Sequence, residues 1–146
     1  MKFYQTKRKI IPGTSLKVVE KIASKLFRRI KSQTKRTPYI RSAYFKREKV
    51  FLNIFWSHLH DKRIPDRVRR LKYFDCALDL IRNSRIKPSV KPNPNNKSEV
   101  LYRFLGQTKH RDLFVVQIKE NRRSKRKDLI SIIPQNKKPS RPSGSV

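Results

Sequence analysis

Hydrophobic and polar residues alternate along three short stretches near the end of the chain, residues 101–105, 113–119 and 129–133. Alternation with a period of two is typical of strands in a half-buried antiparallel sheet. The apolar positions can share one face, and they are Tyr102, Phe104, Phe114, Val116, Ile118, Ile130 and Ile132. The opposite face carries Arg103, Gln117, Lys119 and Ser131. We therefore expect a three-strand meander with one apolar face and one polar face that is open to a ligand.

Earlier in the chain, apolar residues recur at the three-to-four-residue spacing of amphipathic helices. Thr14 or Ser15 can cap a helix that runs to about residue 30. The remaining elements that the pattern predicts are an extended segment over 39–46 and helices over 47–60 and 66–83. Residues 85–98 contain three prolines, three asparagines and almost no apolar side chains, which predicts a mobile loop.

Helices followed by strands are typical of an α+β domain. We expect the N-terminal helices to pack on one face of a small twisted antiparallel sheet. The boundaries that follow are a basic N-terminal arm over residues 1–14, a single domain over 15–134 with its core at 39–134, and a disordered basic tail over 135–146.

The charge changes this picture more than any other property of the chain. The 146 residues include 39 Lys and Arg but only 10 Asp and Glu, so the net charge is +29. Such a chain favours polyanions as partners, and RNA, free or on the ribosome, is the first expectation. The plain alternative is a solvated basic surface without a specific partner.

Two further features concern the environment of the protein. Cys76 is the single cysteine, so an internal disulfide is excluded. No apolar stretch approaches the ~18 residues of a membrane span, and the N-terminus has no signal-peptide core. These features favour a cytoplasmic location without a membrane partner.

The sequence also excludes several kinds of chemistry. Three glycines form no phosphate-binding loop, and one cysteine and three histidines show no zinc-ligand spacing. The carboxylates are scattered and do not form the cluster that a two-metal nuclease needs. We expect neither a metal nor a cofactor, so a nuclease built on this chain would have to work without metal.

RNA cleavage without metal uses the 2′-hydroxyl of the substrate as the nucleophile, and it needs a base, cationic stabilisation and an acid. Arg103 and Lys119 can stabilise the phosphate, and His58 or Lys46 can move the proton. Each of these residues also has a structural interpretation, such as an exposed strand arginine or a partly buried histidine. The candidate RNA contacts are Arg41, Gln117, Ser131, Arg122, Arg123, Lys125, Arg126 and Lys127. The basic run among them would position the phosphate backbone without reading sequence.

The layout of residues 41–62, 69–84 and the three strands, together with the extreme basicity, resembles the barnase–EndoU–colicin–RelE-like nucleases. The resemblance is greatest to phage-associated members and RelE-type toxins. It implies a RelE- or barnase-like domain, a metal-independent endoribonuclease and a toxin or mobile-element role with an acidic antitoxin or immunity protein. By chemical type, Arg103, Lys119 and His58 would then take the catalytic roles. The alternative is a non-catalytic RNA- or DNA-binding protein of the ribosome-associated type.

Overall fold

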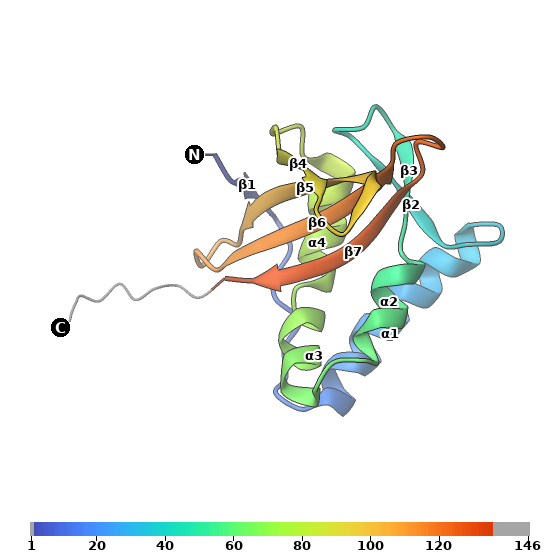
Figure 1. The fold of residues 1–146 in the computed structure, drawn as a ribbon. Coiled ribbons are helices and arrows are strands. Elements are labelled where there is room, and N and C mark those ends of the chain that lie inside the picture. Colours follow the sequence, from blue (N-terminus) through green and yellow to red (C-terminus); the bar gives the residue numbers. More distant parts are fainter. Residues whose placement is uncertain (1, 136–146) are drawn as a thin grey trace.

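The computed structural model describes residues 2–135, which form four helices and seven strands. The elements in chain order are β1 (Tyr4–Gln5), α1 (Leu16–Gln33), β2 (Tyr39–Ser42), β3 (Glu48–Phe51), α2 (Asn53–Leu59), α3 (Ile64–Leu71), α4 (Phe74–Asn83), β4 (Ser89–Asn93), β5 (Asn96–Gln107), β6 (Leu113–Asn121) and β7 (Lys127–Pro134). Figure 1 shows α1, α2 and α3 together below β7, with α4 behind the strongly curved sheet.

The sheet overturns the expected fold class. Its strand order is β1-β5-β6-β7-β3-β2, with β4 also paired to β5. β1 runs parallel to β5 and β3 runs parallel to β7, while the other pairs are antiparallel. The protein is therefore a mixed α/β fold with a seven-stranded mixed sheet, and the expectation of a small antiparallel sheet under N-terminal helices was wrong. The three predicted strands are its centre, and four further strands extend it.

The first extension comes from residues 47–60, where a single helix was expected. Residues 48–51 are instead β3, which pairs with β2 so that Val50 lies opposite Ile40. A tight turn joins the two strands, and Lys46 and Arg47 adopt positive φ values of 56° and 69° in it. Only the second half of the segment is helical, as α2. Val50 is fully buried, so pairing within the sheet outweighs the helical spacing of the apolar residues.

Two other segments also differ from expectation. Residues 66–83 form two helices, α3 and α4, separated by residues 72–73. Residues 85–98 are not a loop, because β4 and the start of β5 form a hairpin there. Pro92 is tolerated in β4 because that strand lies at an edge, where a missing N–H leaves no partner unbonded. Residues 136–146, where most of the disordered tail was expected, lie outside the described residues.

The N-terminal arm is an integrated part of the sheet. β1 pairs with the end of β5 next to Gly106, and Ile11 is only 3 % exposed. The carboxylate of Asp79 in α4 accepts hydrogen bonds from Tyr4 (3.0 Å) and Thr6 (2.6 Å). These contacts fix the basic N-terminal arm across the back of the sheet.

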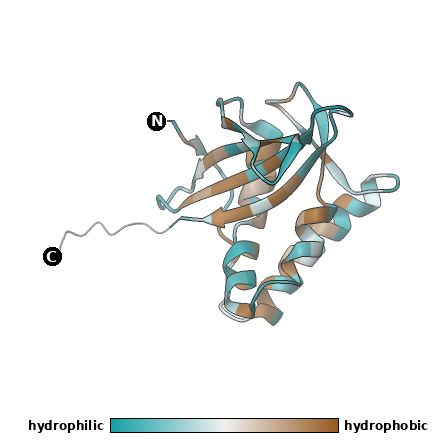
Figure 2. Cartoon of the chain, viewed as in Figure 1, coloured by the Kyte–Doolittle hydropathy of each residue, from teal (hydrophilic) through white to brown (hydrophobic). Residues whose placement is uncertain are grey.

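The hydrophobic core lies between the helices and one face of the sheet (Figure 2). The predicted helix over residues 15–30 is confirmed as α1, whose first turn is capped by Ser15 through the N–H of Val18. On the sheet, the buried positions are largely those that the alternation predicts, including Phe104, Phe114, Val116, Ile118 and Ile132.

One core position on β7 differs from the prediction. A β-bulge shifts the register of β7 relative to β6, so that Ile118 pairs with Leu129 and not with Ile130. Leu129 is fully buried, whereas Ile130 is half-exposed. One extra residue reverses the alternation, because each one-residue step turns a side chain to the other face.

Candidate nucleic-acid interface

The face of the sheet opposite the helices carries a line of polar side chains. Strand register places Arg103 of β5 opposite Gln117 of β6, and Gln117 opposite Ser131 of β7. Nε of Arg103 donates to Oε1 of Gln117 at 2.8 Å. Arg103 is exposed, and within residues 2–135 its two terminal nitrogens have no partner. We call Arg103, Gln117 and Ser131 the polar row.

A fourth side chain joins the polar row from α3. Nη1 of Arg70 donates to Oγ of Ser131 at 2.8 Å and to the carbonyl of Ile132 at 3.1 Å. Its Nε is held by Asp66 at 3.2 Å. Arg70 can reach the row because, in the described structure, β7 pairs with β3 only at its first two residues, which leaves the rest of that edge open. The sequence analysis missed Arg70, since nothing local distinguishes it from the other arginines of the helix.

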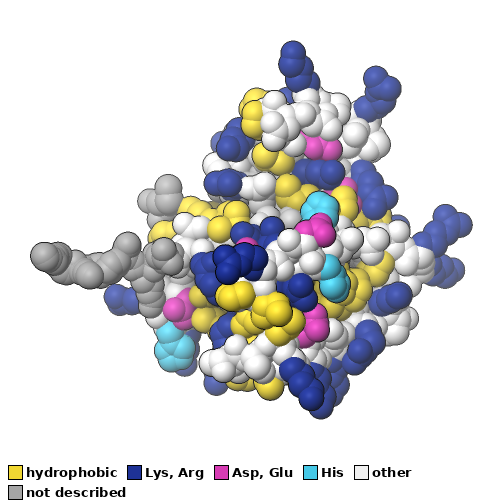
Figure 3. All heavy atoms as spheres, turned by 60° about the horizontal axis from the view of Figure 1, so that its bottom comes forward, with side chains coloured by type: hydrophobic (Ala, Val, Ile, Leu, Met, Phe, Trp, Pro, Cys, Tyr) yellow, Lys and Arg dark blue, Asp and Glu magenta, His cyan; other side chains and the backbone are white. Residues whose placement is uncertain are grey.

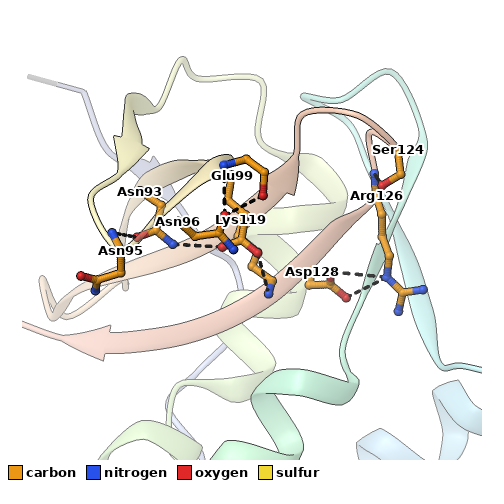
Figure 4. A network of polar contacts seen from close by, with 9 residues as sticks. Asn93, Asn95, Asn96, Glu99, Lys119, Ser124, Arg126 and Asp128 are labelled. Carbon is orange, nitrogen blue, oxygen red and sulfur yellow. Dashed lines mark hydrogen bonds and ion pairs between the residues drawn. The ribbon is translucent and has the colours of Figure 1, made fainter.

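Lys119 lies one row away from Arg103 on the same open face. It pairs with Leu101 across β5 and β6, and its ammonium forms an ion pair with Glu99 at 3.2 Å (Figure 4). The same carboxylate accepts from the side-chain amide of Asn93 at 3.0 Å. Lys119 is thus not an unpaired cation, and the residue that sequence reasoning missed beside it is Glu99.

Aromatic rings and cations meet where β2 and β3 extend the open face. Tyr39 lies opposite Phe51, and their ring centroids are 5.9 Å apart. Nζ of Lys49 lies 4.6 Å from the centroid of the Tyr39 ring, and Cζ of Arg126 lies 4.1 Å from the centroid of the Phe51 ring. Arg41 is exposed beside Tyr39, and its Nη1 donates to the carbonyl of Arg47. We call Tyr39, Arg41, Lys49, Phe51 and Arg126 the aromatic–basic patch.

The turns at one end of the sheet bring further cations together. Because β3 and β7 are parallel neighbours, the turns that precede them, residues 43–47 and 122–126, lie side by side. Arg122 connects these turns to the β4–β5 hairpin, because its backbone N–H donates to the carbonyl of Ser98 and its Nε donates to the carbonyl of Lys97. The exposed cations of this basic turn cluster are Lys46, Arg47, Lys97, Arg122, Arg123, Lys125 and Arg126.

Lys127, although it ends the same basic run, is not available to a ligand. It is 4 % exposed, and its ammonium contacts Glu48, Glu120 (3.0 Å) and the carbonyl of Lys125 (3.0 Å). Its three N–H donors therefore all have acceptors inside the protein. Burial alone would lower the pKa of Lys127, but the two carboxylates raise it above its ordinary value. The assignment of Lys127 as an RNA contact is corrected to a structural role.

Two of the expected catalytic residues lie far from the polar row. His58 is exposed on α2, which packs against the covered side of the sheet at β7. Lys46 is at the tip of the β2–β3 turn. Arg103, Lys119, His58 and Lys46 consequently do not converge on one site. The cations of the protein are spread over its surface instead: the space-filling view in Figure 3, which brings the lower side of the molecule forward, shows Lys and Arg spread widely with few carboxylates between them.

A groove opens at the end of the polar row that Arg103 occupies. Its volume is about 920 Å³. The residues that line it are Lys2, Arg85, Ile86, Lys87, Pro88, Ser89, Arg103, Leu105, Val115 and Gln135. Four of them are cations and none is a carboxylate. We call this hollow the basic groove, and it extends the positive open face away from the basic turn cluster.

Between residues 2 and 135, no group of three His, Cys, Asp or Glu side chains is placed to hold a metal ion. None of the four helices in that range is both long enough and apolar enough to cross a membrane. No family model, curated protein or solved structure matches this chain.

Proposed function

We propose that this protein binds single-stranded RNA across the open face of its sheet. The observation that carries the proposal is the polar row, in which Gln117 holds the exposed guanidinium of Arg103 and its terminal nitrogens have no partner among residues 2–135. A fixed guanidinium with two free nitrogens suits bidentate binding of a phosphate. The net charge of +29 supplies the long-range attraction.

The surroundings of the row favour a single strand over a duplex. Tyr39 and Phe51 are half-exposed rings with cations beside them. Unpaired bases can stack on such rings, whereas the bases of a duplex are already stacked on one another. The basic turn cluster would hold the phosphate backbone beyond the patch without reading its sequence.

The test is a titration of labelled single-stranded RNA, the matching duplex and single-stranded DNA against the protein and two variants. Arg103→Ala removes a proposed phosphate contact, and Arg28→Ala removes an equally charged, exposed side chain of α1 as a control. We expect single-stranded RNA to bind most tightly, with Arg103→Ala weakening it several-fold and Arg28→Ala leaving it nearly unchanged. Equal effects of the two variants would reject the open face as the binding site.

Metal-independent cleavage of the bound RNA is the second candidate, and one observation favours it. The polar row and Arg70 place two guanidiniums along one line, and the Glu99–Lys119 ion pair lies in the next row. The guanidiniums would stabilise charge on the scissile phosphate. Glu99 would take the proton of the 2′-hydroxyl as the O2′–P bond forms, and Lys119 would give a proton to O5′ as the P–O5′ bond breaks. Proton return within the ion pair would restore both groups.

Incubation of intact RNA with the protein in EDTA decides between binding and cleavage. Cleavage predicts fragments with 2′,3′-cyclic phosphate ends, which disappear in Glu99→Gln while RNA binding persists. Intact RNA with tight binding supports the non-catalytic candidate. A toxin role, an acidic antitoxin and a cytoplasmic location belong with the cleavage candidate, and they depend on its outcome.

A further inference from the structure

The basic groove differs from the rest of the open face because its floor is apolar. Leu105 of β5 and Val115 of β6 are directly paired, in the row next to the polar row. Both line the groove, and Val115 is only 6 % exposed. Ile86 and Pro88, from the segment that joins α4 to β4, add apolar surface at its side. An apolar floor suits a flat and weakly polar group.

The rim of the groove suits an anion instead. Its four cations are Lys2, Arg85, Lys87 and Arg103, and they come from three separate parts of the chain. Ser89 and Gln135 supply uncharged hydrogen-bonding groups. A volume of about 920 Å³ lies within the range of ~300–1,000 Å³ that small-molecule sites occupy. A ligand that matches the whole groove must therefore combine a planar apolar body with negative charge.

The pairing of the floor strands excludes one kind of occupant. On its outer side, β5 is paired with β4 up to Arg103 and with β1 from Gly106, so in the described structure only two residues, Phe104 and Leu105, lack a strand partner there. An extended peptide binds a sheet by adding a strand to a free edge, and two residues are too short for one. Recognition in the groove has to come from side chains, as it does for nucleotides on sheet surfaces.

We propose that the basic groove is a nucleotide subsite, in which one base rests on Leu105 and Val115 while its phosphate contacts Arg103. The proposal rests on the RNA-binding function and adds a defined position to it. The remainder of the strand continues from Arg103 along the polar row. The bound RNA therefore has one base that is buried more deeply than the others.

The test compares two substitutions in the same apolar row. Leu105→Glu places a negative charge on the apolar floor, and Ile133→Glu places the same charge at the neighbouring position on β7, which pairs with Val115 but does not line the groove. Binding of short single-stranded RNA and of nucleoside monophosphates is measured for both, with inorganic phosphate as a competitor. We expect Leu105→Glu to abolish mononucleotide binding and to weaken RNA binding about tenfold, because the new carboxylate removes the apolar floor and repels the phosphate. Ile133→Glu should weaken both much less.

A second pair of variants keeps the test valid if Leu105→Glu or Ile133→Glu fails to fold. Lys87→Ala removes a rim cation, and Lys91→Ala removes another exposed lysine, which lies outside the groove. Only Lys87→Ala should weaken mononucleotide binding. If RNA binds and none of the groove variants changes it, the subsite is rejected while the RNA-binding function stands. If the wild-type protein binds no RNA, that function itself fails. Displacement of the mononucleotide by an equal concentration of inorganic phosphate would show that the base is not recognised, and would also reject the subsite.

Discussion

Arg70 and Ser131 are 61 residues apart in the chain, yet Nη1 of Arg70 donates to Oγ of Ser131 at 2.8 Å. The same nitrogen also donates to the carbonyl of Ile132, so Arg70 covers the open edge of β7 at this point. One side chain thus contributes both to the polar row and to the stability of the sheet, and substitutions can separate the two contributions.

Ser131→Ala removes the side-chain bond but leaves the bond between Arg70 and the carbonyl of Ile132. We expect it to lower the free energy of unfolding by less than about 1 kcal/mol, whereas Arg70→Ala removes both bonds to β7 and the ion pair with Asp66 and should lower it by about 2 kcal/mol. Urea denaturation measures these values, and RNA titration shows whether either variant also weakens binding. Equal destabilisation by the two variants would contradict the closure of the β7 edge by Arg70.

The basic turn cluster should contribute to the salt dependence of RNA binding. Each phosphate contact on a single strand contributes about 0.7 to the slope of log affinity against log salt concentration. Arg123→Ala with Lys125→Ala should therefore reduce the slope by up to about 1.4 and weaken all RNA sequences alike. The control is Arg28→Ala with Lys31→Ala on the exposed face of α1. A slope that changes equally in both double variants would mean that the turns have no special role.

Lys127→Met should damage stability without acting on RNA directly. It leaves the carboxylates of Glu48 and Glu120 without their shared ammonium, and Glu120 is largely buried. Removal of one partner from a buried ion pair typically lowers stability by about 3 kcal/mol or more. Addition of Glu120→Gln should recover part of that loss, because the uncompensated charge is then gone. A Lys127→Met protein with wild-type stability and weakened RNA binding would restore Lys127 as an RNA contact.

Gly106 lies directly beneath the ring of Phe114. A Cβ atom at this glycine would lie 2.3 Å from Cζ of Phe114, and the ring is fully buried. Gly106→Ala should therefore lower the free energy of unfolding by about 2 kcal/mol, as other overpacked cores do. In a Phe114→Leu background the added methyl group should have a smaller effect. A double-mutant cycle measured by denaturation gives this difference, and strict additivity would show that the ring and the glycine do not interact.

Acid should weaken the attachment of the N-terminal arm to Asp79. Burial alone would raise the pKa of Asp79, but hydrogen bonds lower it below its ordinary value of 3.8. The donors are Thr6, Tyr4, Asn83 and the backbone of Lys7. Because the folded pKa is depressed, this contribution to stability is present above pH 3.8 and is lost as the pH falls through the folded pKa. Thermal unfolding at a series of pH values should show a steeper acid decline in the wild-type protein than in Asp79→Asn. Parallel curves would mean that another carboxylate controls the decline.

Local alternation was sufficient to predict the centre of the sheet and the polar row. Arg103, Gln117 and Ser131 share a face because strand period and strand register agree there. The prediction failed where distant residues decide. Val50 fits a helical stripe as well as a strand, and only its partner strands distinguish the two. Leu129 replaces Ile130 in the core because of a bulge that no local pattern announces.

Charge was a poorer guide to single residues than to the whole surface. The run of cations at residues 122–127 looks uniform in sequence, yet Arg122 to Arg126 are exposed and Lys127 is buried. The difference arises from Glu48, whose position beside Lys127 depends on the parallel pairing of β3 with β7. Arg70 could not be selected for the corresponding reason, since its place beside Ser131 exists only after α3 has packed.

The parallel pairing of β3 with β7 also sets the order in which the molecule can be made. β3 ends at Phe51, and its partner β7 begins at Lys127, so more than half of the chain separates the two strands. Pairings between such distant segments form late, because the loop between them must close first. During synthesis, the β2–β3 hairpin leaves the ribosome before β7 does. The edge of β3 that later pairs with β7 is then unpaired, and Val50 lacks its neighbour Lys127. The aromatic–basic patch, which needs Arg126 beside Phe51, is completed only when the last strand arrives. Most Lys and Arg residues of the nascent chain are accordingly made before this part of its binding surface exists.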